Sequence, residues 1–191
     1  SMLNELKKYN FKNLVVWNRG VDTELFNPNK RDINSKDTQL TYVGRVAIEK
    51  NIEEFLKLKG NYNKTVVGDG PELQKYINKY PEVNFVGLKR GNELAEYYAN
   101  ADVFVFPSKT DTLGNVILEA LACGTPIAAF PVTGPKDILK DSKINTLDDR
   151  LGNSVEKALK VNRNDCREFA MKFTWEDCAN EFLDSQIDSK N

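Results

Sequence analysis

Short apolar segments alternate with amphipathic segments along most of the 191-residue chain. The apolar segments are rich in β-branched and aromatic residues and are bounded by Gly, Pro or polar residues, which is typical of strands. Because their residues are apolar in continuous runs, they fit strands buried on both faces, as in a parallel sheet. The predicted strands comprise residues 14–17, 40–43, 65–67, 84–86, 103–106 and 126–130.

Between the predicted strands, apolar residues recur at the three- and four-residue spacing of a helix. Alternating strands and helices predict βαβ units and therefore a doubly wound, Rossmann-like parallel sheet flanked by helices, an α/β fold. After Asp148 only amphipathic helices are predicted, and they form a helical C-terminal tail. The predicted helices comprise residues 48–58, 71–80, 92–100 and 114–123, and the expected anchors of the tail are Phe169, Phe173, Trp175, Phe182 and Leu183.

The composition indicates one domain and excludes several classes of protein. At ~100–200 residues per domain the chain forms a single unit, which we place at residues 13–184, between tails at 1–12 and 185–191. With 27 Lys+Arg against 28 Asp+Glu the net charge is −1, which argues against a nucleic-acid partner. No apolar run reaches the ~20 residues of a transmembrane helix, and the N-terminus lacks the apolar core of a signal peptide.

Cysteine and histidine usage adds two expectations. The three cysteines are scattered without a Cys-x-x-Cys pair, which indicates reduced thiols and a cytoplasmic location. The chain contains no histidine, the commonest general base and metal ligand, and nothing in the sequence suggests a metal site.

In open α/β sheets, ligands bind at the carboxyl ends of the strands, so the segments that follow the predicted strands are informative. The first is residues 44–51, where Gly44 permits close backbone approach and Arg45 and Lys50 bracket the start of a predicted helix. Two cations converging there would hold a diphosphate. Solvated surface charges beside Glu49 are the alternative explanation.

The next segment, Gly68-Asp69-Gly70-Pro71, is a tight turn that needs no ligand to explain it. There is no Gly-x-Gly-x-x-Gly motif and no phosphate-binding Gly-Lys-Thr loop.

The richest segment follows the predicted strand 103–106. It carries Asp111 in a polar loop, Gly114 at a helix start and Glu119 on the helix, off its apolar face. Because helical side chains tilt toward the N-terminus, Glu119 leans back toward the loop. Both carboxylates are therefore expected to border one cavity with backbone N–H groups between them, an arrangement that suits a sugar nucleotide. A helix cap at Asp111 and a solvated Glu119 are the alternative.

Together these segments resemble the C-terminal domain of the family-4 retaining glycosyltransferases, one half of the GT-B fold. The resemblance extends from about Leu14 to Leu183, and its individual motifs are weak but occur in the family's order. Within the first motif, Arg19 is an extra residue relative to the family's Asn-Gly-Val-Asp pattern. The motifs are Asn18-Arg19-Gly20-Val21-Asp22, Gly44-Arg45 with Glu49-Lys50-Asn51, Val67–Pro71, Phe85-Val86-Gly87, Asp111 with Glu119, Ala122–Pro126 and Phe173-Thr174-Trp175-Glu176.

The resemblance implies a role for each matched residue. Arg45 and Lys50 would hold the donor diphosphate and stabilise the leaving phosphate, Asp111 would contact hydroxyl groups of the donor sugar, and Glu119 would bind the ribose hydroxyls. No metal and no cofactor other than the donor, a UDP- or GDP-sugar, is implied. The remaining implied contacts are Gly44 and Gly68, the backbone of Leu88 and Lys89 beside the base, and Thr112, Leu113, Gly114 and Asn115 beside the sugar and phosphate.

Two positions depart from the family pattern. Asp111 stands where the family has Glu, which keeps the carboxylate but shortens its reach by one methylene. Residues 131–137 differ from the family's usual Gly-rich loop, and Lys136 in them is either an added phosphate contact or a surface lysine.

The resemblance implies a hexosyltransferase that moves a hexose from a UDP- or GDP-sugar to a saccharide or lipid-linked acceptor. Such enzymes bind the acceptor mostly through an N-terminal domain, which we expect to be absent from this chain, leaving the fragment inactive alone. Peripheral association of the full-length enzyme with the inner face of a membrane stays open. So do two other functions: half of a GT-B-fold epimerase or phosphorylase, and a non-catalytic α/β interaction module, in which Arg45, Lys50 and Glu119 would be scattered.

Overall fold

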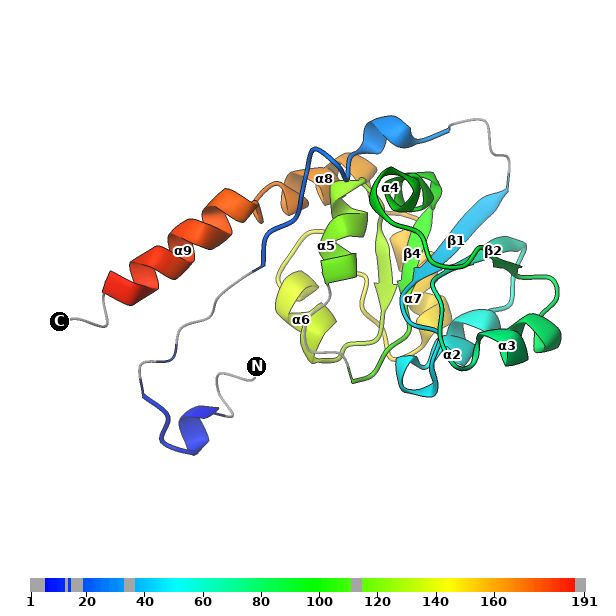
Figure 1. The fold of residues 1–191 in the computed structure, drawn as a ribbon, viewed down its shortest axis with the longest axis horizontal. Coiled ribbons are helices and arrows are strands. Elements are labelled where there is room, and N and C mark those ends of the chain that lie inside the picture. Colours follow the sequence, from blue (N-terminus) through cyan, green and yellow to red (C-terminus); the bar gives the residue numbers. More distant parts are fainter. Residues whose placement is uncertain (1–5, 13, 15–18, 33–36, 111–114, 188–191) are drawn as a thin grey trace.

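The computed structural model describes residues 6–12, 14, 19–32, 37–110 and 115–187. The described strands form one parallel sheet in the order β3-β2-β1-β4-β5, which confirms the predicted fold class (Figure 1). The order reverses between β1 and β4, which is the topological switch point where open α/β sheets bind ligands. The strands are β1 (Thr38–Val43), β2 (Tyr62–Val67), β3 (Asn84–Phe85), β4 (Val103–Phe106) and β5 (Ile127–Ala129).

Strand register brings the carboxyl ends to one edge of the sheet. Val43 at the end of β1 pairs with Val67 at the end of β2. On the other side of the switch point, Phe106 at the end of β4 pairs with Ala129 of β5. The loops that follow these strands therefore emerge side by side.

Helices cover both faces of the sheet, and the alternation of side chains along the strands explains why. In β4, Val103 and Val105 belong to one apolar core, and Phe104 and Phe106 to the other. The first core is closed by α2 (Ile52–Leu56), α3 (Leu73–Lys79) and α7 (Leu151–Ala158). The second is closed by α4 (Gly91–Asn100), α5 (Asn115–Ala122), α6 (Thr133–Leu139) and α8 (Arg163–Ala170).

The single helix predicted for residues 48–58 is wrong, because the structure divides it. A 3-10 turn, η2 (Ile48–Lys50), ends at Asn51, whose φ of 51° is left-handed, and α2 then begins at Ile52. The Asn51 side-chain amide donates a hydrogen bond of 2.9 Å to the carbonyl of Pro107, beyond β4. Asn tolerates the left-handed conformation better than most residues, so this long-range contact breaks the helix. A second 3-10 turn, η1 (Pro28–Lys30), precedes β1.

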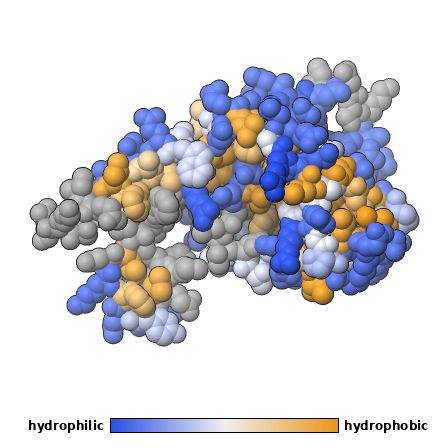
Figure 2. Space-filling view, in the orientation of Figure 1, coloured by the Kyte–Doolittle hydropathy of each residue, from blue (hydrophilic) through white to orange (hydrophobic). Residues whose placement is uncertain are grey.

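The C-terminal helix α9 (Trp175–Ile187) extends away from the sheet (Figure 1). Phe169 and Phe173 are half-buried against the second core, as predicted. The prediction that Trp175, Phe182 and Leu183 anchor the tail is wrong, since their exposed fractions are 56%, 45% and 58%. Their helix runs beyond the core they were expected to contact, and apolar surface is visible along it in Figure 2.

Other expectations are reached only in part. Of the strand predicted at 14–17, residues 15–17 lie outside the described residues, and the domain limits of 13 and 184 stay predictions. Cys123, Cys166 and Cys178 are not joined in disulfides, and all three are buried. In the part of the chain that the structure describes, no helix has both the length and the apolar character needed to cross a bilayer.

Candidate functional site

Two cavities adjoin at the carboxyl edge of the sheet. The first, of about 390 Å³, lies over the ends of β1 and β4, and the second, of about 520 Å³, lies over the ends of β1 and β2 and the segment after β3. Both are lined by Val43, Gly44 and Arg45, so they adjoin, and we call the two together the edge cleft. The first cavity is also lined by Arg19, Tyr42, Lys50, Phe106, Pro107, Ser108, Asn115 and Val116, and the second by Val67, Gly68, Asp69, Gly70, Leu88, Lys89 and Leu94.

The floor of the edge cleft depends on close backbone contact between the turns that follow β1 and β2. The N–H of Gly44 donates to the carbonyl of Val67 at 3.0 Å, and the N–H of Val46 donates to the carbonyl of Asp69 at 2.9 Å. Gly68 has a φ of +144°, and a Cβ atom added there would lie 1.9 Å from the carbonyl oxygen of Gly44. A glycine is therefore required at position 68 so that the backbone of this turn can lie against the backbone of Gly44.

The structure places Arg45 and Lys50 together in the first cavity. The Tyr42 hydroxyl donates to the Arg45 carbonyl at 2.8 Å and fixes the backbone at this point. The Arg45 guanidinium is 63% exposed and lies 3.3 Å from the Glu49 carboxylate, a contact that solvent weakens. A non-catalytic interaction module was expected to have Arg45 and Lys50 far apart, and their shared cavity contradicts that expectation for these two residues.

Arg19 is the residue that sequence reasoning missed as part of the site. It lines the first cavity with Arg45 and Lys50 and, within the described residues, has no ion-pair partner. Its position is set by Gly20, where an added Cβ would lie 2.6 Å from the Cα of Trp175, and by the Val21 N–H, which donates to Phe173 at 2.8 Å. The only sequence feature that singled out Arg19 was that it is an extra residue relative to the family's Asn-Gly-Val-Asp pattern.

The lining of the first cavity is rich in cationic side chains. Among its described lining residues there are three cations and no Asp or Glu. Asn115 and Val116 at the first turn of α5 complete its wall, and the unsatisfied N–H groups of a helix N-terminus favour anions. Asp111, Thr112, Leu113 and Gly114 lie outside the described residues.

Glu119 lies one helical turn beyond Asn115 on α5 and is not among the residues that line the cavity. The Tyr98 hydroxyl donates a 2.9 Å hydrogen bond to its Oε2 atom. Burial raises the pKa of Glu119 from its ordinary value, and the hydrogen bond from Tyr98 opposes that rise. Glu119 is therefore not among the residues that line the cavity as described, although the first turn of its helix is, and its role at the site stays a prediction.

The second cavity gathers three further predicted contacts. Gly68, Leu88 and Lys89 all line it. Leu88 is 60% exposed, while the Lys89 side chain is 25% exposed and lies 3.5 Å from Glu93.

Two further expectations from the sequence concern Lys136 as a phosphate contact and the need for a metal or cofactor. Lys136 lines a different cavity, of about 420 Å³, between α6 and α8, which excludes it from the edge cleft as described. No group of three or more His, Cys, Asp or Glu side chains among the described residues is arranged to hold a metal ion. That the site needs neither metal nor cofactor stays a prediction.

Sequence comparison finds relatives that are much longer than this chain. The sulfoquinovosyl transferase SQD2 of Arabidopsis thaliana is 35% identical over 145 residues, which are 68% of this chain and 28% of that protein. A GDP-mannose-dependent alpha-mannosyltransferase of Corynebacterium glutamicum is 33% identical over 149 residues, 73% of this chain and 36% of its own length. The chain thus spans about a third of these relatives.

Solved structures show the same fold. Sucrose-phosphate synthase from Thermosynechococcus elongatus matches with a TM-score of 0.72 and 25% identity, over 91% of this chain and 52% of that one. Anabaena HepE, solved with UDP and glucose, matches with a TM-score of 0.68 over 90% of this chain and 56% of that one, and its 16% identity supports the fold alone. The family model described as glycosyl transferases group 1 matches residues 24–172. The parallel sheet, the sequence relatives and this match agree: the chain belongs to the group 1 glycosyl transferase family.

Proposed function

We propose that this chain is the donor-binding half of a retaining glycosyltransferase, which transfers a hexose from a UDP- or GDP-sugar to a saccharide or lipid-linked acceptor. The observation that carries the proposal is the convergence of Arg19, Arg45 and Lys50 in one cavity beside the first turn of α5. Cations in a partly enclosed site bind phosphate through charge-assisted hydrogen bonds. The relatives, one named for GDP-mannose, support a nucleotide sugar as the donor.

The two parts of the edge cleft suit the two ends of such a donor. The diphosphate lies in the first cavity, where the cations are, and Glu119 accepts hydrogen bonds from the ribose hydroxyls. The base lies in the second cavity, beside the backbone of Leu88 and Lys89. The sugar lies on the side of Ser108 and Asn115, toward the segment that carries Asp111.

The chemistry that this arrangement supports is stabilisation of the leaving group. When the bond between the anomeric carbon and the phosphate oxygen breaks, negative charge grows on the diphosphate, the sugar passes to the acceptor oxygen, and the acceptor's proton passes to the departing phosphate oxygen. Arg45 and Lys50, already in place, stabilise that charge without reorganisation, which is an efficient form of catalysis. No side chain described here acts as the base. Because the chain spans about a third of its relatives, we assign acceptor binding to the rest of the protein.

Calorimetric titration tests the proposal. The chain, shown to be folded by circular dichroism, is titrated with UDP, GDP, UDP-glucose and GDP-mannose. At least one should bind, and binding should weaken as salt is raised, because phosphate contacts are screened. If the folded chain binds none of them, the proposal fails for this chain. A full-length protein that isomerises a nucleotide sugar without an acceptor would instead be an epimerase.

A further inference from the structure

The hydroxyl of Tyr98 forms a hydrogen bond with the carboxylate proposed to bind ribose. The phenol donates to Oε2 of Glu119 at 2.9 Å, across the contact between α4 and α5. Among the described residues, the other carboxylate oxygen, Oε1, has no hydrogen-bond partner. One oxygen of Glu119 is therefore held by the protein, and the other has no hydrogen-bond partner within the part of the chain that the structure describes.

Packing and hydrogen bonding restrict the Tyr98 side chain and therefore fix the position of its hydroxyl. The side chain is fully buried. Its ring meets Phe26 and Phe104 edge to face, with centroids 5.9 Å and 5.4 Å apart. The Thr125 hydroxyl donates to the backbone carbonyl of Tyr98 at 2.6 Å. A ring packed on both sides aims its hydroxyl at one point, and that point is Glu119.

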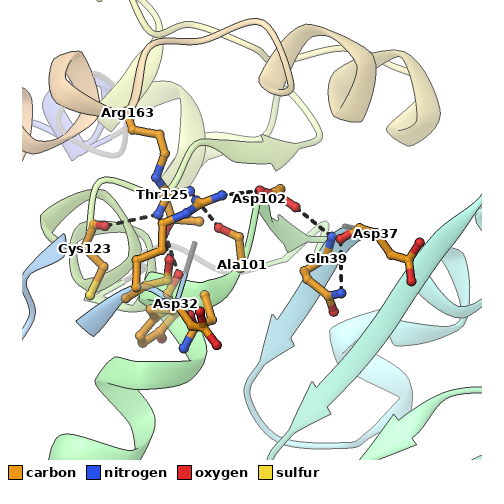
Figure 3. Close-up of polar contacts among 12 residues, drawn as sticks. Asp32, Asp37, Gln39, Ala101, Asp102, Cys123, Thr125 and Arg163 are labelled. Carbon is orange, nitrogen blue, oxygen red and sulfur yellow. Dashed lines mark hydrogen bonds and ion pairs between the residues drawn. The ribbon is translucent and has the colours of Figure 1, made fainter. Parts of the chain in front are cut away.

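The helices that carry the two residues are clamped together by Arg163 of α8. Its guanidinium donates to the carbonyl of Ala99 at 2.8 Å and of Ala101 at 2.7 Å, at the C-terminal end of α4. It also donates to the carbonyl of Cys123, just past the end of α5, at 3.3 Å, and to the Thr125 hydroxyl at 3.1 Å. Figure 3 shows Arg163 reaching toward Ala101, Cys123 and Thr125. A cation at two helix C-termini is favourable for both, so the spacing of α4 and α5 is fixed.

Resting on the proposed function, we propose that Tyr98 is a positioning residue of the nucleotide site. Its hydroxyl holds the Glu119 carboxylate in one orientation, so that the carboxylate accepts hydrogen bonds from the ribose hydroxyls of a bound nucleoside diphosphate. A carboxylate held in place loses less rotational freedom on binding than a free one, which strengthens the contact. Without the Tyr98 hydroxyl, a half-buried Glu119 would be free to rotate and less favourably ionised.

The test compares nucleotides that differ only at the ribose. UDP and GDP are titrated against their 2′,3′-dideoxy counterparts, using the wild-type chain, Tyr98→Phe and Tyr97→Phe. Tyr97 is the matched control, since it lies next to Tyr98 on α4, is only half-buried, and its hydroxyl has no hydrogen bond within the described residues. Tyr98→Phe keeps the ring and removes only the hydroxyl. Thermal unfolding of each variant shows that it is folded.

The wild-type chain should prefer the ribonucleotide by about 100-fold, since hydrogen bonds to charged groups are strong, and Tyr98→Phe should cut that preference about tenfold. Tyr97→Phe should leave it unchanged. If Tyr98→Phe weakens both nucleotides equally, or neither, Tyr98 has only a structural role and the proposal is overturned. If the wild-type chain binds nucleotides without preferring ribose, the roles of Tyr98 and Glu119 both fall while donor binding stands. If it binds none, the proposed function fails, and Tyr98 with it.

Discussion

Replacing Gly68 by Ala tests whether the floor of the edge cleft depends on backbone contact. The new Cβ atom would lie 1.9 Å from the carbonyl oxygen of Gly44, where ordinary contact begins at 3.4 Å. The obstacle is backbone, which cannot rotate away as a side chain can. Gly44 must therefore move, and with it the hydrogen bond of its N–H to Val67 and the neighbouring bond from Val46 to Asp69.

The expected cost has two parts. The φ of +144° at Gly68 is a conformation that L-residues rarely adopt, and such strain costs about 1–3 kcal/mol. The two displaced hydrogen bonds contribute about 0.5–1.5 kcal/mol each. The free energy of unfolding should therefore fall by about 2–6 kcal/mol, a large share of the ~5–15 kcal/mol of a typical domain.

Denaturant unfolding, followed by nucleotide titration of the variant that remains folded, measures both effects. Gly87→Ala is the matched control, because its φ of +72° carries strain but no atom lies within 4 Å of the added Cβ. It should cost about 1–2 kcal/mol. Gly68→Ala should cost clearly more and should also weaken nucleotide binding. Equal losses in the two variants would refute the reasoning, since the close approach at Gly68 would then have no energetic consequence.

Three further predictions concern the ligand. Lys50→Ala should weaken the binding of UDP or GDP, measured by calorimetry, by about 10- to 100-fold, and should change the binding of uridine or guanosine little. The reason is that a charge-assisted hydrogen bond to phosphate is lost only when phosphate is present. Equal losses for nucleotide and nucleoside would place Lys50 away from the phosphates. Arg19→Ala should lower the affinity for UDP or GDP and flatten its salt dependence, whereas the exposed Arg150→Ala should change neither; matching behaviour of the two variants would remove Arg19 from the site. Burial raises the pKa of Glu119, so its folded-state carboxylate takes up a proton at a higher pH than an exposed Glu, and nucleotide affinity should fall as the pH drops through that raised pKa. Glu119→Gln should abolish this dependence, and an unchanged pH profile would exclude Glu119 from binding.

The sequence predicted the edge of the sheet well for a physical reason. Continuous apolar runs identify buried strands, and parallel strands bring their carboxyl ends together, so Gly44, Arg45 and Lys50 could be placed in one site without coordinates. Gly68 and Leu88 were expected at the site only through the family resemblance, since the turn at Gly68 needs no ligand to explain it.

What the sequence could not reveal depends on contacts between distant residues. The helix break at Asn51 requires the carbonyl of Pro107, 56 residues away. The pairing of Tyr98 with Glu119 arises from helix packing, and apolar periodicity alone gives no sign of it. Trp175 follows a helical apolar pattern, yet its helix points away from the core, a direction that periodicity does not encode.

The central claim, that a nucleoside diphosphate binds along the edge cleft, is tested most directly by mapping amide NMR shifts during titration with UDP and with GDP. The amides of Gly44, Gly68, Leu88 and Asn115 should move together and saturate at one dissociation constant. Shifts confined to the cavity between α6 and α8, or no shifts at all from a folded chain, would contradict the account.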